Sequence, residues 1–301
     1  MQNRNSAYPA LALVVLGIIW GYNWVVMKKV LEYCGPFDFA ALRTFFGALC
    51  LFAVLAWMKK PLRPTALKTT LLLGLLQTSI FTALVMWALV AGGAGKTAVL
   101  TYAMPFWLLV IAWPFLGERI HGVQWLAVIL AFAGLGLILE PWRAHGSLAS
   151  NLIATSAGIV WAFAAVVAKK LRGRVQVDLL SLTAWQMLLG GAVLVAVTLF
   201  IPQRPLAFTP YFWGALAYNA ILATGLAWLL WLYVLNRMQA GVAGLAVLAV
   251  PVIGVLSAWL EIGEQPQPLE ITGMLLIGVA LALLGFLGMR ERRVEPELAQ
   301  E

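Results

Sequence analysis

Long runs of apolar residues, separated by short stretches that hold prolines and charges, dominate this sequence. Each run reaches the roughly 20 residues that an α-helix needs to cross the hydrocarbon core of a bilayer. Because lipid offers the backbone no hydrogen-bond partner, these runs are predicted to be helices, and their unbroken apolar character excludes a β-barrel. The predicted spans are Tyr8–Val30, Pro36–Met58, Leu67–Val90, Ala94–Leu116, His121–Leu139, Leu148–Leu171, Asp178–Ile201, Pro210–Leu235, Ala240–Ile262 and Pro268–Met289.

The composition places the chain in a membrane. Hydrophobic residues make up 63% and charged residues 11% of it, whereas an average soluble domain has about 45–50% apolar and about 25% charged residues. The spans occupy most of the 301 residues, so no sizeable soluble domain fits. The net charge of +8 comes from cations in the loops at span ends, which is typical of membrane topology and does not indicate nucleic-acid binding.

The chain contains an internal repeat. The segments from Trp20 to Lys29 and from Trp161 to Lys170 both begin with Trp and end in Val-Val-x-Lys-Lys. Further on, the set Pro105, Gly117 and Glu118 recurs with the same internal spacing as Pro251, Gly263 and Glu264. The copies are expected at 8–140 and 148–289, followed by a charged cytoplasmic tail at 290–301. Each copy holds five spans, and an odd number of crossings forces the copies into opposite orientations, as in secondary transporters.

Lysine and arginine set the orientation. With a cytoplasmic N-terminus, fourteen of the twenty Lys and Arg residues lie on the cytoplasmic side and five on the other. Since cytoplasmic loops carry the excess of these residues, both termini are predicted to be cytoplasmic. The fold class expected is an all-α integral membrane protein with ten transmembrane helices, arranged as two inverted five-helix repeats around a central cavity. The expected location is the cell inner (plasma) membrane.

The predicted membrane interior lacks acidic groups. All twelve Asp and Glu residues fall at span ends or outside the spans. An exporter that exchanges cationic drugs for protons needs a buried acid, so this distribution weighs against that mechanism. Only Arg43 is a cation within a span. The ordinary interpretation is that it snorkels or ties two helices through backbone carbonyls, and a contact with a substrate carboxylate is the alternative.

Enzyme signatures are missing as well. The two histidines, His121 and His145, lie in loops without metal-ligand spacing, and no nucleophile–base constellation appears. We therefore expect no enzymatic activity, no metal and no cofactor. The partners expected are the lipid bilayer and a small-molecule substrate, with the chain acting as a monomer.

Aromatic and uncharged polar residues gather near the middle of several spans. The candidate substrate-binding residues are Trp20, Asn23, Gln77, Thr78, Tyr102, Trp161, Tyr218, Asn219 and Trp228. Amides and hydroxyls can bind the ammonium and carboxylate of a small zwitterion, and aromatic faces attract its ammonium. Any one of these residues is also compatible with helix packing or with an interfacial aromatic belt, so the cluster is more persuasive than its members.

Pro105 and Pro251 lie within the fourth and ninth spans, at equivalent positions of the two copies. Each removes one helix hydrogen bond. Two interpretations remain open, a symmetric pair of hinges that lets the halves rock and a pair of static kinks.

These motifs, together with Ala41-Leu42-Arg43, resemble the EamA repeat of the drug/metabolite transporter superfamily, over nearly the whole chain. The chain also resembles the YddG-type amino acid exporters of that superfamily. The resemblance implies ten helices in two inverted halves around a central cavity, and export of amino acids or related metabolites across a bacterial inner membrane. Two positions depart from the repeat: Ala164 stands where Asn23 would recur, and Thr183 lies near the place of Arg43.

The sequence therefore predicts an alternating-access exporter of amino acids, aromatic ones among them, and of related small metabolites. A broader drug and metabolite efflux transporter is the alternative within transport. A non-transporting membrane scaffold or a channel is the alternative from another class.

Overall fold

The computed structural model describes residues 7–140, 148–237 and 249–298, and this part of the chain contains helices and no strand. Eight helical stretches in it are long and apolar enough to cross a membrane, and two shorter apolar helices accompany them. The elements are α1 (Ala7–Val30), α2 (Pro36–Trp57), α3 (Leu67–Leu73), η1 (Gly74–Ile80), α4 (Phe81–Ala91), α5 (Ala94–Tyr102), α6 (Met104–Leu116), α7 (Val123–Leu139), α8 (Leu148–Arg172), α9 (Leu179–Phe200), α10 (Pro210–Ala217), η2 (Tyr218–Leu226), α11 (Ala227–Arg237), α13 (Ala249–Ile262) and α14 (Pro268–Leu298), where η marks a π-helix. The protein is a multi-pass membrane protein.

The helices match the predicted spans closely, because prolines and polar loops mark most of the boundaries. Wherever both ends are described, they agree within two residues, with α14 as the exception. That helix continues to Leu298, through most of the predicted tail at 290–301. Residues 240–248 of the predicted span Ala240–Ile262 and residues 299–301 of the tail lie outside the described residues.

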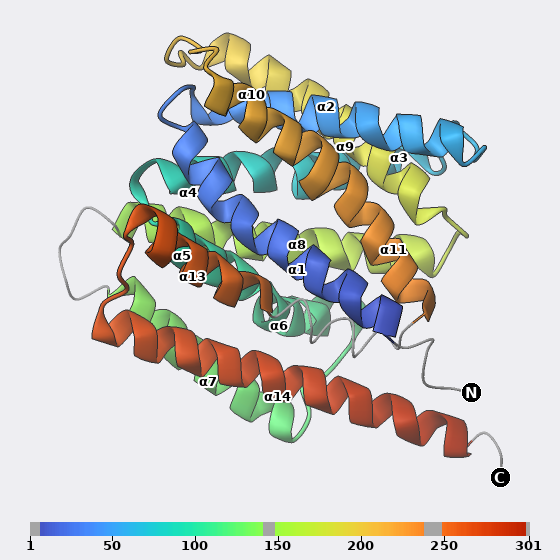
Figure 1. Cartoon of the computed structure of the whole chain (residues 1–301). Helices are drawn as coiled ribbons and strands as arrows, with labels where there is room; N and C mark the ends of the chain where they lie inside the picture. Colours follow the sequence, from blue (N-terminus) through green and yellow to red (C-terminus); the bar gives the residue numbers. More distant parts are fainter. Residues whose placement is uncertain (1–6, 141–147, 238–248, 299–301) are drawn as a thin grey trace.

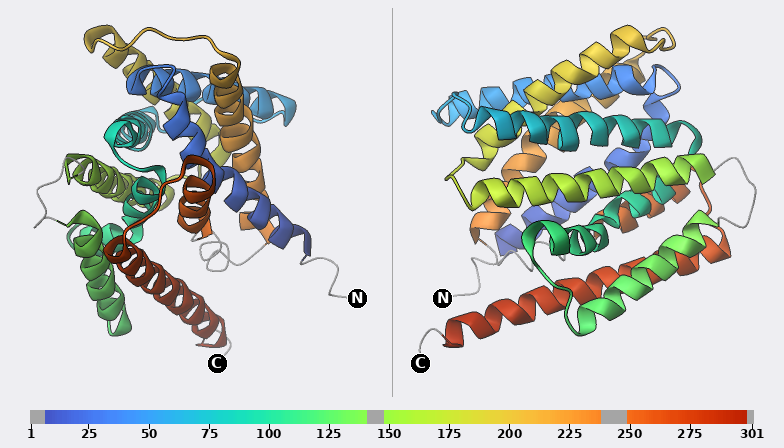
Figure 2. Two further views of the ribbon diagram at one scale, coloured as in Figure 1. Left: turned by 60° about the vertical axis from the view of Figure 1, so that its left-hand side comes forward. Right: turned by 180° about the vertical axis from the view of Figure 1, so that it is seen from behind.

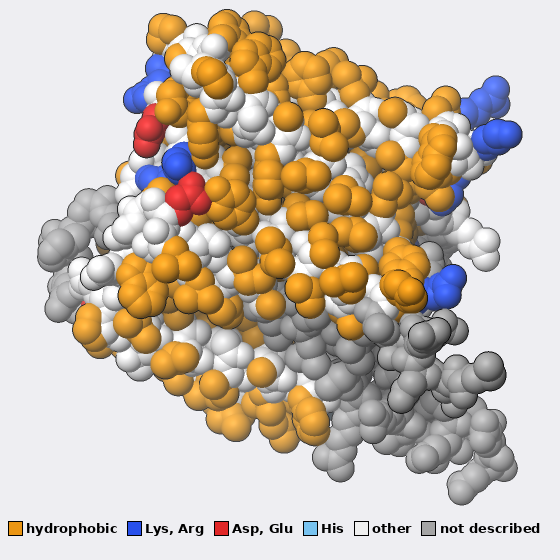
Figure 3. All heavy atoms as spheres, viewed as in Figure 1, with side chains coloured by type: hydrophobic (Ala, Val, Ile, Leu, Met, Phe, Trp, Pro, Cys, Tyr) orange, Lys and Arg blue, Asp and Glu red, His pale blue; other side chains and the backbone are white. Residues whose placement is uncertain are grey.

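The helices form a bundle with a pair of helices at each edge. At one edge α2 packs along α9, with η1 against α9, and at the other edge α7 packs along α14 (Figures 1 and 2). Helices α1, α4, α5, α8 and α13 lie between these pairs. Apolar side chains cover the visible face of the bundle, while Lys and Arg gather at its two ends (Figure 3). This distribution suits a body that is surrounded by lipid along its sides and by water at its ends.

Contacts at the two ends show that α1 and α8, which are equivalent in the repeat, run in opposite directions. At the end of α1, the Lys28 ammonium donates to the carbonyl oxygens of Leu89, at 2.7 Å, and of Gly92, at 2.9 Å, just before α5 begins. At the end of α8, Lys169 forms an ion pair at 2.5 Å with Glu118, just after α6 ends. Since α5 and α6 lead from the first end to the second, α1 and α8 terminate at opposite ends of the bundle.

Lys28 and Lys29, at the C-terminal end of α1, are both engaged by groups at this end of the bundle. Lys28 satisfies carbonyls at the C-terminal end of α4, where a cation is favourable. Lys29 pairs at 2.8 Å with Glu261 at the end of α13. Both charges are thus held by this end of the bundle.

The repeated Gly-Glu motif has a structural role. Gly117 ends α6 with φ of 73°, and Gly263 follows α13 with φ of 68°. This left-handed conformation favours glycine and terminates a helix. The next residue in the second copy, Glu264, accepts hydrogen bonds from the backbone N–H groups of Ala94 and Gly95, at 2.9 Å and 3.2 Å. Its carboxylate therefore caps the N-terminus of α5, where the helix dipole favours a negative charge.

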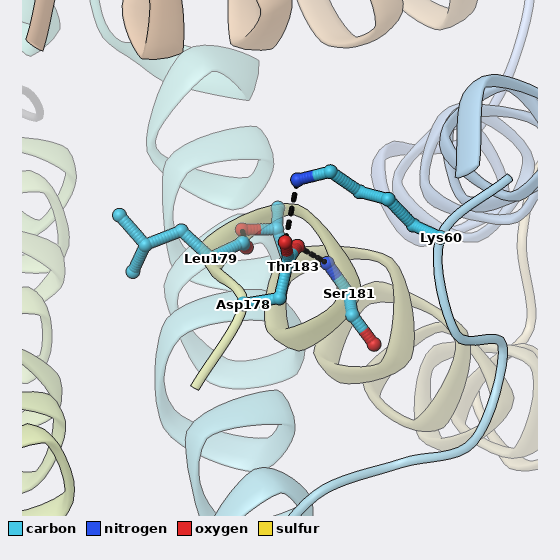
Figure 4. A network of polar contacts seen from close by, with 5 residues as sticks. All are labelled: Lys60, Asp178, Leu179, Ser181 and Thr183. Atoms are coloured by element: carbon cyan, nitrogen blue, oxygen red, sulfur yellow. Dashed lines mark hydrogen bonds and ion pairs between the residues drawn. The ribbon is translucent and has the colours of Figure 1, made fainter. Parts of the chain in front are cut away.

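An ion pair fixes the start of α9. The carboxylate of Asp178 accepts a hydrogen bond from the Ser181 backbone N–H at 3.0 Å and pairs with Lys60 at 2.5 Å (Figure 4). Burial raises the pKa of Asp178, but the hydrogen bonds from Lys60 and Ser181 and the attraction of Lys60 lower it by more, so the pKa lies below its ordinary value. In its charged form, the Asp178 carboxylate ties the loop that follows α2 to the start of α9.

We expect Asp178→Ala to destabilise the protein by about 1 kcal/mol through loss of the N-cap. Asp178→Asn keeps an acceptor for Ser181 and should cost only the ion pair, which is partly exposed and so contributes about 0.2–1 kcal/mol. A carboxyl whose pKa falls on folding stabilises the fold above its unfolded pKa, and this contribution is lost as the pH falls through the folded value. The difference in stability between wild type and Asp178→Asn should therefore be largest above about pH 4 and should decrease below it. Thermal unfolding in detergent across pH measures this, and a pH-independent difference would contradict it.

Candidate central cavity

A cavity of about 510 Å³ lies inside the bundle. Its wall is built by helices from both copies of the repeat, with indole, phenol, amide and hydroxyl groups among mainly apolar neighbours. The lining residues are Trp20, Asn23, Trp24 and Met27 of α1, Arg43 and Thr44 of α2, Gln77 and Thr78 of η1, Phe81, Thr82 and Val85 of α4, Tyr102 of α5, Met104 and Pro105 of α6, Trp161 of α8, Thr183, Gln186 and Met187 of α9, Ala223 and Thr224 of η2, and Trp228 and Trp231 of α11.

Most of the candidate substrate-binding residues meet at this cavity. Seven of the nine line it: Trp20, Asn23, Gln77, Thr78, Tyr102, Trp161 and Trp228. Tyr218 and Asn219 do not. The Tyr218 hydroxyl donates to the Ile19 carbonyl at 2.7 Å, and the fully buried Asn219 amide donates to the Ala215 carbonyl at 3.0 Å. Both side chains therefore bond to the backbone of helices, Tyr218 to α1 and Asn219 to α10, and neither lines the cavity.

One side of the cavity is an aromatic cluster around Tyr102. Its ring meets Trp161 edge-on, with centroids 5.5 Å apart, and Trp24 at 6.3 Å. Phe81 lies 5.3 Å from Trp161. Edge-to-face pairs of this kind fix ring orientations, so the cluster presents a defined aromatic surface to the cavity.

A second aromatic cluster surrounds Trp20. Its indole N–H donates to the Ala223 carbonyl at 3.0 Å, and its ring lies 6.5 Å from Trp228 and 6.3 Å from Trp231. Because Ala223 belongs to η2, this bond joins α1 of the first copy to the second. Trp20 and Trp161, which are equivalent in the repeat, thus each anchor one aromatic cluster of the wall.

Two π-helical segments, η1 and η2, occupy corresponding spans of the two copies. π-helices are rare and occur frequently at functional sites. Each supplies a threonine to the wall, Thr78 and Thr224, and η1 adds Gln77. In η1, the Ser79 hydroxyl also lies 2.8 Å from the Gly190 carbonyl of α9, which anchors the segment to its neighbour.

Arg43 is the one charged side chain that lines the cavity among the residues whose side chains are described. It makes no hydrogen bond and no ion pair with any of them. Of the interpretations drawn from the sequence, a tie to backbone carbonyls is not among the described contacts, whereas snorkelling and a contact with a substrate carboxylate remain predictions. Asn23 is buried, and its side-chain carbonyl oxygen has no hydrogen-bond partner among the described residues. The cavity wall thus holds a cation and an acceptor that protein groups leave unused.

The two prolines differ in their surroundings. Pro105 lines the cavity as the second residue of α6, and Ala103 is the residue that separates α5 from α6. The buried Thr101 hydroxyl beside this break has no hydrogen-bond partner among the described residues. Pro251 is buried in α13 and does not line the cavity. Their role as hinges remains a prediction, and the helix break at Pro105 is where bending would concentrate.

The cavity wall has no carboxylate among the described residues, and this part of the chain contains no cluster of His, Cys, Asp and Glu that could hold a metal ion. Sequence reasoning did not assign Thr183, Gln186 or Trp24 to the site. Thr183 had one signal, its place near the repeat image of Arg43, and both residues line the same cavity.

Comparisons with known proteins agree with this architecture. The model of the EamA-like transporter family matches residues 7–140 and 148–286. The Bacillus subtilis protein named uncharacterized transporter YoaV is 29% identical, with 89% of this chain and 93% of the relative covered. The Escherichia coli protein named probable amino-acid metabolite efflux pump is 27% identical, with 94% of this chain and 96% of the relative covered.

A solved crystal structure shares the fold, with a TM-score of 0.64 at 18% identity, and it covers 92% of this chain and 98% of the other. The two family matches coincide with the two copies of the repeat that build the cavity. The chain therefore belongs to the EamA-like transporter family of the drug/metabolite transporter superfamily, with two EamA repeats, and is a transporter.

Proposed function

We propose that this transporter exports amino acids, aromatic ones among them, and related small metabolites by alternating access. The observation that carries the proposal is the central cavity, lined by indole, phenol, amide and hydroxyl groups of both repeats and by no described carboxylate. Its volume of about 510 Å³ lies within the roughly 300–1,000 Å³ typical of small-molecule sites. The name of the Escherichia coli relative supports the same substrate class.

Both aromatic clusters suit the side chain of an aromatic amino acid, which stacks on indole and phenol rings. The ring faces also attract its ammonium group. The unpartnered Asn23 oxygen is a further acceptor for that ammonium. The wall therefore offers complementary groups to the side chain and to the ammonium of an aromatic amino acid.

The proposed topology is ten transmembrane helices with both termini in the cytoplasm of a plasma membrane. The opposite directions of α1 and α8 support an inverted repeat, and α1 begins at the end of the bundle where α14 ends (Figure 1). The excess of Lys and Arg at that end supports its cytoplasmic location. A membrane-impermeant thiol reagent should label a cysteine introduced at Arg63, after replacement of Cys34 and Cys50, only in inverted or permeabilised vesicles. Labelling from outside intact cells would overturn this topology.

Release of labelled amino acids from preloaded proteoliposomes tests the function. We expect saturable release that protein-free vesicles lack, and release of a different metabolite with none of any amino acid would refute the substrate assignment. Saturation and competition between substrates also separate a transporter from a channel. Release of many unrelated drugs at similar rates would favour the broader efflux function.

We further expect transport without strict coupling to a proton gradient, because no described carboxylate lines the cavity to exchange a proton for substrate. The steady-state ratio of amino acid concentrations across the membrane should change by less than about threefold when a pH gradient of one unit is imposed, against about tenfold for one-to-one coupling. The measurement compares vesicles with and without the gradient at equal internal pH. Accumulation that follows the gradient stoichiometrically would contradict the expectation.

A further inference from the structure

Arg43 is exceptional in this bundle because its charge faces the cavity without a counterion. The other described lysines and arginines lie towards the ends of the helices or in loops, and several are paired there, as Lys29 is with Glu261 and Lys60 with Asp178. Arg43 instead is the eighth residue of α2 and lines the cavity. An uncompensated charge inside a membrane protein is costly and marks a functional site by default.

The other polar residues of the cavity wall on α2 and α9 do not neutralise Arg43. Thr44, which follows it on α2, and Thr183 and Gln186, which face the cavity from α9, carry no charge. The Thr183 hydroxyl donates at 2.7 Å to the carbonyl of Leu179 in its own helix, so it is bound to the backbone of α9 (Figure 4). The described part of the cavity wall therefore carries a positive charge and no anionic group that balances it.

We propose, building on the amino acid export proposed above, that Arg43 binds the carboxylate of the transported molecule and so makes compounds with a free carboxylate the preferred substrate class. The planar guanidinium matches a carboxylate with two parallel hydrogen bonds, a geometry that a lysine ammonium does not reproduce. The bound anion replaces the missing counterion. The rest of the cavity, aromatic and amide in character, receives the remainder of the substrate.

Transport tests the proposal with matched substrates. In proteoliposomes of the full chain, wild type should move labelled phenylalanine about 10- to 100-fold more efficiently than phenylalaninamide, which lacks the carboxylate. Arg43→Gln should lose most of this preference, mainly through a higher KM for phenylalanine. Arg204→Gln is the control, because Arg204 lies away from the cavity and donates at 3.1 Å to the Leu31 carbonyl. It should keep the wild-type preference.

A purely structural role for Arg43 predicts a different result. Transport of phenylalanine and of phenylalaninamide would then fall by the same factor in Arg43→Gln, so the preference would be unchanged. An unchanged preference would overturn the role proposed for Arg43, while the proposal of amino acid export would stand. Arg43→Lys should retain a smaller preference for phenylalanine, because lysine keeps the positive charge but lacks the two parallel N–H donors of the guanidinium.

A binding measurement decides the role of Arg43 even if wild type exports no amino acid. Tryptophan fluorescence of the purified protein, titrated with benzoate and with benzamide, reports on the indoles of the cavity. Wild type should bind benzoate more tightly, and Arg43→Gln should bind the two probes equally. Equal affinities in wild type itself would overturn the proposal, even where the variant fails to fold.

Discussion

Replacing Trp161 by alanine is expected to reduce amino acid transport about 30-fold or more while the protein still folds. Trp161 meets Tyr102 and Phe81 in one aromatic cluster of the cavity, so its loss removes a substrate surface and frees two neighbouring rings. Aromatic residues of this kind are binding hot spots, worth about 2 kcal/mol or more. Initial rates of release from proteoliposomes, normalised to the amount of folded protein, measure the effect.

The matched control is Trp185→Ala. Trp185 lies outside the cavity, with its indole N–H bonded at 2.8 Å to the Leu62 carbonyl and its ring 5.2 Å from Phe52. This variant loses an equally large side chain but should transport at nearly the wild-type rate per folded molecule. Equal losses in the two variants would mean that tryptophan removal acts through stability alone. Trp161→Phe should recover part of the transport.

The second large effect is expected at Gly190, where α9 touches η1. A Cβ atom at this position would lie 2.6 Å from Thr78 Cβ, and one at Gly74 would lie 2.7 Å from the Gln186 carbonyl. Gly190→Ala should therefore push the two helices apart and destabilise the protein by about 1–3 kcal/mol. Because Thr78 and Gln186 line the cavity, substrate affinity should fall together with the stability of the protein.

Gly214→Ala provides a control of opposite sign. Gly214 lies in α10 with nothing within 4 Å of an added Cβ. There the better helix propensity of alanine should stabilise the protein by about 0.5–1 kcal/mol. Thermal unfolding in detergent compares both variants with wild type, and a Gly190→Ala protein as stable as wild type would show that the backbones do not meet as closely as described.

The helices could be predicted from the sequence because hydrophobic length and proline positions are strong local signals in a membrane protein. The two π-segments could not, since the one extra residue that widens a helix leaves no distinct pattern. Each shifts the rotational phase of the residues around it. Within η2, Tyr218 and Asn219 at its start do not line the cavity, while Ala223 and Thr224 further along do.

The repeat supplied the other part of the site. Trp20 and Trp161, found by symmetry, each anchor an aromatic cluster of the wall, one through Trp228 and the other through Tyr102. Arg43 could not be assigned, because a lone arginine within a span fits a snorkelling side chain as well as a ligand contact. Its place on the cavity wall, which is built by helices far apart in the sequence, is what favours the ligand contact.

The symmetric and asymmetric features have separate roles in this account. The paired helices, the Gly-Glu turns and the two π-segments repeat across the halves and form the framework. Arg43 and Thr183 occupy related positions in the two halves and face the same cavity, yet only one is charged. Selectivity for the substrate is therefore expected from the positions where the repeat is broken.

The most direct test of the central claim is the location of a bound amino acid. A structure of the full chain with a transported amino acid should place the ligand in the cavity, with its ring against Trp161 and Tyr102 or against Trp20 and Trp228, and its carboxylate at Arg43. Density for the ligand outside the cavity, with the cavity empty at saturating concentration, would contradict the account.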